Sequence, residues 1–262
     1  MSSLSRRELK RLASLQTKKY RQREGQCVLE GLRLCQDALR SDWTLRNLFA
    51  TPEFAGRFED TALFTAARQR NLEVSIIPAA DLDRITGTQT AQGVAVLADL
   101  PAARQFRPGE PDLTPVLLLD AISDPGNLGT LIRSADWFGV PDIVLGPGTV
   151  EWSNPKVMRS TMGSVFRVRL FDTGDWNVTL RSLRDAGYRI LAADLHGRPL
   201  REYASDPGDG PWALLLGNEA QGISPSLSSS ADTVYTITGT GETDSLNVAM
   251  AGTVFLYEFN RN

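Results

Sequence analysis

The chain has 262 residues, 42% hydrophobic side chains and a net charge of −3, a composition typical of a globular protein with one or two domains. It contains no run of about eighteen apolar residues and no short apolar segment behind its first residues, so we expect neither a membrane span nor a secretion signal. Two cysteines, Cys27 and Cys35, and one histidine are too few for a disulfide framework or a usual metal-ligand set. We therefore predict a cytoplasmic protein without a metal site.

Positive charge is concentrated at the start of the chain. Residues 1–112 contain 17 Lys and Arg against 14 Asp and Glu, whereas residues 113–262 contain 11 against 17. Segment 1–25 is the most basic and predicts a helical, positively charged surface for a polyanion partner. A solvated helix face is the competing interpretation, and a transit peptide is disfavoured because regularly spaced leucines lead into sequence of folded type.

Residues 26–100 alternate short apolar runs with helical patterns, which predicts a small α/β unit. Helices are expected to end near Arg40 and to cover residues 62–71. The expected strands are 26–31, 45–53, 72–78 and 93–100. Four prolines within 101–115, with no apolar periodicity, then indicate a linker, which we place at 101–114.

The alternation restarts after the linker and continues to the end of the chain. Helices are expected over 127–139, near 153–162, near 175–186, and from Ser245, which resembles a helix N-cap. The expected strands are 115–120, 142–146, 164–171, 188–195, 212–219 and 233–237. Strands this apolar, separated by helices, predict a parallel sheet covered on both faces, so we assign domains to residues 1–100 and 115–262.

A dinucleotide-binding fold is the first interpretation to test. It requires GxGxxG after the first strand of the domain. The sequence there is DPGNLG, which lacks that spacing, and GPGTVE and GTGETD lack the third glycine. A nucleotide-dependent oxidoreductase is therefore a weaker hypothesis.

Three other segments follow apolar strands and carry glycine or asparagine. They are DAISDPGNLGTLIRSADWFG from Asp120, LLLGNEAQGIS from Leu214, and YTITGTGETDSLNVAMAGTVFLYE from Tyr235. Because ligands of open α/β sheets gather at the carboxyl ends of the strands, these segments are expected to converge on one site.

Together the three segments resemble the SpoU family of RNA ribose 2′-O-methyltransferases, within the SPOUT superfamily. The first matches from Asp120 through Arg133, the second through Gly217, Glu219 and Gly222, and the third through Ser245-Leu246-Asn247. NPKVMRSTMGSVFRV (154–168) resembles the segment between them. Residues 26 to about 98 resemble the family's accessory RNA-binding domain, which has a ribosomal-protein-like fold.

The resemblance implies a C-terminal SPOUT domain with a deep trefoil knot, and S-adenosylmethionine held by backbone of the knotted loops. It also implies a homodimer through the C-terminal domain, in which the site is completed across the subunit interface. The cofactor-binding residues implied by residue matching are Leu216, Gly217, Asn218, Ile237 and Leu246.

The catalytic residues implied by the resemblance are Arg133, Asn127, Glu219, Ser245 and Asn247. We interpret Arg133 as a phosphate clamp that orients the nucleotide, because a guanidinium stays protonated and is a poor base. The acceptor of the 2′-hydroxyl proton is left open. A structural pairing of Arg133 with Glu219 or Asp124 is the alternative.

The partner is expected to be RNA, and ribosomal RNA is favoured because an accessory N-terminal domain is commoner in the family's ribosomal-RNA enzymes. A transfer-RNA enzyme and a non-catalytic RNA-binding relative are the alternatives. We expect His196 to be structural, and Trp137 and Phe138 to pack in the core or in a dimer. The residues expected to hold RNA phosphates are Lys18, Lys19, Arg21, Arg23, Lys156, Arg159 and Arg167.

Overall fold

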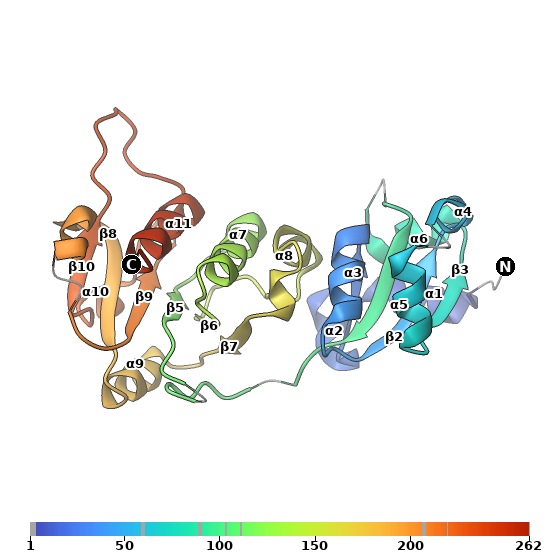
Figure 1. Cartoon of the computed structure of the whole chain (residues 1–262), viewed down its shortest axis with the longest axis horizontal. Coiled ribbons are helices and arrows are strands. Elements are labelled where there is room, and N and C mark those ends of the chain that lie inside the picture. Colours follow the sequence, from blue (N-terminus) through green and yellow to red (C-terminus); the bar gives the residue numbers. More distant parts are fainter. Residues whose placement is uncertain are drawn as a thin grey trace. The chain divides into compact units, whose positions relative to one another are not determined.

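The computed structural model describes residues 4–58, 61–88, 91–102, 104–110, 112–205, 208–218 and 220–261. The chain forms two compact units (Figure 1). We call Met1–Ala102 with Glu151–Phe166 the N-terminal unit, and Ala103–Val150 with Arg167–Asn262 the C-terminal unit. The division after Ala102 lies inside the predicted linker. Residues 151–166, however, pack in the first unit, although the sequence analysis assigns them to the second domain.

The N-terminal unit is built on a mixed sheet in the order β1-β4-β2-β3, in which β4 is antiparallel to β1 and β2, and β3 is parallel to β2. Leucines of the first helix recur every three residues and join the buried core of this sheet. The strands are β1 (Gln26–Glu30), β2 (Leu45–Ala50), β3 (Glu73–Ile76) and β4 (Val94–Asp99). The helices before and between them are α1 (Arg6–Ser14), α2 (Lys18–Glu24), α3 (Leu32–Arg40), α4 (Pro52–Phe58), α5 (Ala62–Gln69) and α6 (Ala79–Thr86).

Helices α4 and α6 were not predicted. Pro52 is the first residue of α4, and Pro78 is the N-cap residue of α6. Proline is compatible with the first helical turn because the N–H that it lacks would have no partner within the helix there. The predicted strand 45–53 therefore ends at Ala50, before Pro52, and Pro78, the predicted last residue of strand 72–78, is the N-cap of α6 instead.

Residues 151–166 contain α8 (Pro155–Ser160) and a 3₁₀ helix, η1 (Ser164–Phe166). The predicted strand 164–171 is thus wrong in its first half, and only its second half contributes to β7 (Arg169–Asp172). Gly163, just before η1, has a φ of +90°, and a Cβ atom there would overlap the carboxylate of Asp37. The aromatic ring of Phe166 then packs edge-on against Trp43, with ring centroids 4.9 Å apart.

The C-terminal unit contains a parallel sheet in the order β10-β8-β9-β5-β6-β7, which confirms the predicted sheet type. Every residue of the strands β5, β6 and β9 is buried, as expected for strands covered on both faces. Besides β7, the strands of this unit are β5 (Val116–Leu119), β6 (Asp142–Leu145), β8 (Arg189–Pro199), β9 (Trp212–Leu216) and β10 (Thr233–Thr236). Its helices are α7 (Pro125–Trp137), α9 (Trp176–Asp185), α10 (Pro225–Ser228) and α11 (Val248–Phe259), with a 3₁₀ helix, η2 (Leu200–Ser205). In the described part of the chain, no helix is long and apolar enough to cross a bilayer.

Helices α7 and α11 lie side by side in the C-terminal unit (Figure 1). The hydroxyl groups of Ser134 and Thr253 share a hydrogen bond of 2.7 Å, and the rings of Phe138 and Tyr257 pack edge-on, 6.2 Å apart. A Cβ atom at Gly252 would come within 2.7 Å of a Leu216 methyl group. The small residues at the start of α11 therefore permit its close approach to α7 and β9.

Burial keeps Cys27 and Cys35 as neutral thiols. Both are free and buried, and the loss of solvation raises the pKa of both thiols, that of Cys27 to about 12. A raised pKa in the folded state gives stability that is complete below the ordinary thiol pKa of 9.0 and is lost as the pH rises toward the folded value.

We predict that the free energy of unfolding falls more steeply above about pH 9 in the wild type than in a Cys27→Ala/Cys35→Ala variant, by up to about 1.4 kcal/mol per pH unit for each thiol. Urea unfolding at a series of pH values measures both slopes. The cavities that alanine leaves lower the free energy of unfolding by the same amount at every pH, so they do not change the slope. Equal slopes would show that the thiols ionise without unfolding.

Candidate active site

The carboxyl ends of β5, β9 and β10 lead into the three segments singled out in the sequence. β5 and β9 are neighbours, with Leu119 opposite Leu216, and the amide of Asp120 donates to the carbonyl of Leu216 at 2.8 Å. Parallel strands end at the same edge of a sheet, so the segments converge there, as predicted.

A tight turn follows β9 and is closed by two backbone hydrogen bonds between Asn218 and Gly222, of 3.0 and 2.8 Å. The Asn218 amide oxygen accepts two further N–H groups of the turn, and its nitrogen donates to the carbonyl of Ala121 at 2.9 Å. A Cβ atom at Gly217 would overlap the backbone of Gly222. The Asn218 side chain thus links the second segment to the first.

Asp120 lies at the same edge of the sheet and binds two neighbouring elements. Its carboxylate is buried and accepts hydrogen bonds from the indole N–H of Trp176, at 3.1 Å, and from the amide of Ser224, at 3.0 Å. A buried carboxylate needs such donors because it has lost its water. Asp120 therefore joins the first segment to α9 and to Ser224, the last residue of the second segment.

Asn247 is the N-cap residue of α11, which corrects the expectation that the helix starts at Ser245. Its side-chain oxygen accepts the amides of Ala249, at 2.9 Å, and Met250, at 3.4 Å. This leaves its amide nitrogen to donate to the side-chain oxygen of Asn127, at 3.0 Å. The predicted catalytic residues Asn127 and Asn247 therefore meet, and they join the first segment to the third.

The turn after β9, the segment after β10 and the start of α11 enclose a pocket of about 730 Å³. All five predicted cofactor-binding residues line it, together with the predicted Ser245. The lining residues are Ala193, Asp194, Leu195, Leu216, Gly217, Asn218, Ala220, Gln221, Gly222, Thr236, Ile237, Gly239, Gly241, Thr243, Asp244, Ser245, Leu246, Val248, Ala251 and Phe255.

Of the predicted catalytic residues that the structure describes, Ser245 lines this pocket, whereas Asn127, Asn247 and Arg133 do not. Glu219 lies outside the described residues. Arg133 projects from the middle of α7 and is exposed, and within the described part of the chain it forms no hydrogen bond or ion pair. The alternative pairing of Arg133 with Asp124 is not formed, because Asp124 caps α7 by accepting the amide of Asn127 at 2.8 Å.

The exposed side of α7 also carries Trp137, which is 83% exposed and therefore does not pack in the core of this chain. Phe138 differs, because it is half-buried against Tyr257. His196 is exposed, and its backbone amide donates to the carboxylate of Asp194.

The basic residues of α2 differ in their availability to a partner. Lys18, Lys19 and Arg23 are exposed, although Arg23 pairs with Glu24. Arg21 must be removed from the predicted RNA surface, because its side chain is 2% exposed and bonds Glu151 at 2.6 Å. Its other donors bond Ser153 and two backbone carbonyls. Arg21 therefore holds residues 151–166 in the N-terminal unit.

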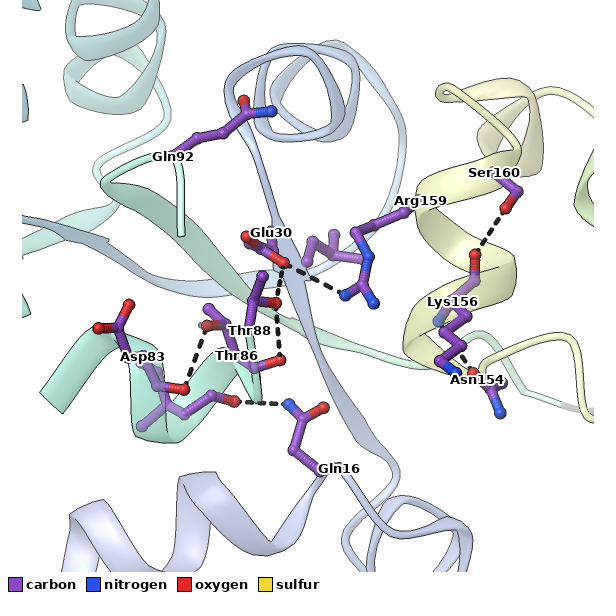
Figure 2. A network of polar contacts seen from close by, with 12 residues as sticks. Gln16, Glu30, Asp83, Thr86, Thr88, Gln92, Asn154, Lys156, Arg159 and Ser160 are labelled. Carbon is purple, nitrogen blue, oxygen red and sulfur yellow. Dashed lines mark hydrogen bonds and ion pairs between the residues drawn. The ribbon is translucent and has the colours of Figure 1, made fainter. Parts of the chain in front are cut away.

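The residues around α8 form a polar network (Figure 2). Glu30 is buried on β1, and its Oε2 atom accepts hydrogen bonds from the hydroxyl of Thr88, at 2.7 Å, and from Arg159, at 3.2 Å. Arg159 is half-buried and Lys156 is exposed one turn earlier. Arg167 belongs to the other unit and pairs through two nitrogens with Asp136. The predicted RNA-binding residues are thus divided between the two units.

Comparison with known proteins places this geometry in a family. The sequence model of the SpoU rRNA Methylase family matches residues 114–257, more than half of the chain. The chain belongs to the SpoU rRNA methylase family. The sequence model of the MRM3-like substrate binding domain matches residues 6–96 of this SpoU protein.

Full-length relatives support the same assignment. The 23S rRNA (guanosine(2553)-2′-O)-methyltransferase RlmP of Bacillus subtilis (strain 168) is 28% identical over 258 residues, which cover 98% of this chain and 97% of the relative. A TrmH-family protein of Porphyromonas gingivalis has a solved structure with 32% identity and a TM-score of 0.82, covering 98% of both chains. The structure of AdoMet-bound rRNA methyltransferase from Sinorhizobium meliloti has 29% identity and a TM-score of 0.83, covering 100% of this chain and 97% of that one.

The predicted SpoU family and methyltransferase activity are therefore confirmed, and the oxidoreductase hypothesis is set aside. Asp194, Thr236 and Asp244 also line the pocket of this SpoU protein, although no sequence motif predicts them as site residues. Asp194 follows no recognisable motif. It reaches the site only because β8 lies between β9 and β10 in the sheet, an order that the sequence does not display.

Replacement of Asn247 separates its two roles. Asn247→Ala removes the cap and is expected to lower stability by about 1 kcal/mol, whereas Asn247→Asp keeps a capping oxygen and the wild-type stability to within about 0.5 kcal/mol. Both variants lose the donor to Asn127, so both should lower the methyl-transfer rate by about tenfold. Urea unfolding and methyl incorporation measure the two effects. Wild-type turnover by the aspartate variant would show that the link to Asn127 is dispensable.

Proposed function

We propose that this SpoU protein transfers a methyl group from S-adenosylmethionine to a ribose 2′-hydroxyl of ribosomal RNA. The observation that carries the proposal is the pocket at the carboxyl edge of the C-terminal sheet, lined by all five residues matched to cofactor binding. The names of the Bacillus subtilis and Sinorhizobium meliloti relatives support the reaction, the cofactor and the class of RNA.

The residues of the pocket fit S-adenosylmethionine. Its volume of about 730 Å³ lies within the usual range for ligands of this size. Leu216, Ile237 and Leu246 offer apolar walls to the adenine ring, and their backbone groups offer polar contacts. Gly239 and Gly241 have open space where a Cβ would stand, so a ligand can approach the chain closely.

When bound, the cofactor supplies a methyl group on a positively charged sulfur. The ribose 2′-oxygen would accept this methyl group as the carbon–sulfur bond leaves its electron pair on sulfur, and the hydroxyl proton would pass to a positioned side chain or to a phosphate of the RNA. The protein must hold the hydroxyl in line with the methyl group and favour negative charge on the oxygen. Asn127, Asn247 and Ser245 are placed to position the nucleotide at the pocket, because Ser245 lines it and the two asparagines bond each other beside it.

Arg133 acts as the phosphate clamp of the reaction. Its guanidinium is exposed and forms no contact within the described residues, so its planar donors are available to a nucleotide. Because Arg133 does not line the pocket of its own chain, we assign it to the pocket of a second subunit.

The exposed apolar face of α7 and α11 supports the homodimer that this assignment needs. Trp137 is 83% exposed, Met250 61%, Tyr257 53% and Val254 41%, although α7 and α11 pack side by side. An apolar surface of this kind marks a protein interface, and a second copy of the chain is the occupant we propose. Arg133 lies one helical turn before Trp137 and would enter that interface with it.

A trefoil knot is part of the proposal. It is supported by the path of the chain after β10, where the third segment lines the pocket beside Gly217 and α11 then packs against α7 and Leu216. The N-terminal unit is the RNA-binding part. Its exposed Lys18, Lys19 and Lys156 support phosphate binding, with Arg23 and Arg159 beside them.

Mapping of 2′-O-methyl groups tests the function. Total RNA from cells with and without the gene is expected to differ at a ribosomal-RNA position, and purified protein should restore that methyl group. Arg133→Ala should lower the rate about 10²- to 10³-fold and Arg133→Lys less, because lysine keeps the charge without the planar fork. Arg181→Ala, at an exposed position of α9, is the matched control. A changed transfer RNA, or no changed RNA, would contradict the proposal.

Mixed dimers test the assignment of Arg133 to a second subunit. Ala251→Phe fills part of the pocket, so each of Arg133→Ala and Ala251→Phe alone should be inactive. Co-expressed, they should recover about a quarter of the wild-type activity, because half of randomly formed dimers are mixed and each has one complete site. A chain that carries both substitutions, expressed alone, should remain inactive. No recovery by verified mixed dimers would place Arg133 in the site of its own subunit.

A further inference from the structure

The charged groups of the pocket have one sign. Among its described lining residues, Asp194 and Asp244 are carboxylates, and none is lysine, arginine or histidine. The nearby Arg198 lies outside the lining and pairs with Glu202. The pocket therefore presents negative charge to whatever enters it.

Asp194 is the better placed of the two carboxylates. It belongs to β8, just beyond the residues that pair with β9, and its side chain is half-buried. One oxygen accepts the backbone amide of His196 at 3.1 Å, and no other hydrogen bond or ion pair holds the carboxylate within the residues described. Asp244 is exposed on the segment that precedes α11, where water screens its charge more strongly.

We propose that Asp194, assisted by Asp244, makes the pocket selective for the positively charged cofactor over its neutral-sulfur product. This inference rests on the proposed function. S-adenosylmethionine carries one positive charge more than S-adenosylhomocysteine, and the two differ otherwise by a single methyl group. A half-buried carboxylate lining the pocket attracts the first more strongly, because the lower local dielectric strengthens the interaction.

Selectivity of this kind assists turnover. The same transfer that methylates the RNA removes the positive charge from sulfur. The attraction of Asp194 for the cofactor is therefore lost in the chemical step, and the product is free to leave. A purely apolar pocket would instead disfavour the cofactor, because it would remove water from the sulfonium charge without a compensating group.

Isothermal titration of three ligands tests the inference without measuring activity. The ligands are S-adenosylmethionine, S-adenosylhomocysteine and sinefungin, whose protonated amine places a positive charge near the position of the sulfonium. Asp194→Asn keeps an oxygen for the His196 amide and removes only the charge. Asp185→Asn, at an exposed position of α9 outside the pocket, is the matched control.

We expect Asp194→Asn to weaken S-adenosylmethionine and sinefungin about tenfold and S-adenosylhomocysteine less than about twofold. The control should leave all three affinities unchanged. Equal losses for the three ligands, or no loss for any, would overturn the inference while the proposed function stands. Failure of the wild type to bind any of the three would instead overturn the proposed function.

Discussion

At the carboxyl edge of the C-terminal sheet, Gly217 lies against the backbone of Gly222, and Gly252 of α11 lies against the side chain of Leu216, with no room for a Cβ atom at either glycine. This constraint holds the site together. With Gly217 against the backbone of Gly222, the turn after β9 can close and carry Asn218 to the carbonyl of Ala121. With Gly252 against Leu216, the start of α11 lies beside the same turn. Close packing at these two glycines brings together the turn after β9 and the start of α11, and both line the pocket.

Much of the C-terminal unit could be predicted because its signals are local. A run such as VLLL after the linker is apolar on both faces, which is typical of a parallel strand with helices on both sides. The residues proposed to bind the cofactor could be named because they lie inside motifs that resemble those of the SpoU family. Asn127 and Asn247 illustrate the limit of such motifs, because their spacing does not reveal that their side chains bond each other.

The residues that escaped prediction depend on tertiary order. Asp194 lies in the site because β8 is inserted between β9 and β10, although β9 follows it in sequence. Arg21 and Lys18 are both basic residues of one short helix, yet Arg21 is buried by a partner 130 residues away, whereas Lys18 is exposed. Composition identifies a basic segment, but only its exposed side chains can contact RNA. Which side chains are exposed depends on residues that are distant in the sequence.

The packing of residues 151–166 in the N-terminal unit has a consequence for biosynthesis. A ribosome delivers the strands β1 to β4 early, but the ion pair between Arg21 and Glu151 cannot form until the chain has been made well past β6. Domains generally fold in the order in which they are synthesised. Completion of the first unit must here wait for the synthesis of residues 103–150 of the second, because Glu151 and Ser153 are the later partners of the Arg21 guanidinium. The two halves of this enzyme are therefore coupled in the time of their folding before any RNA is bound.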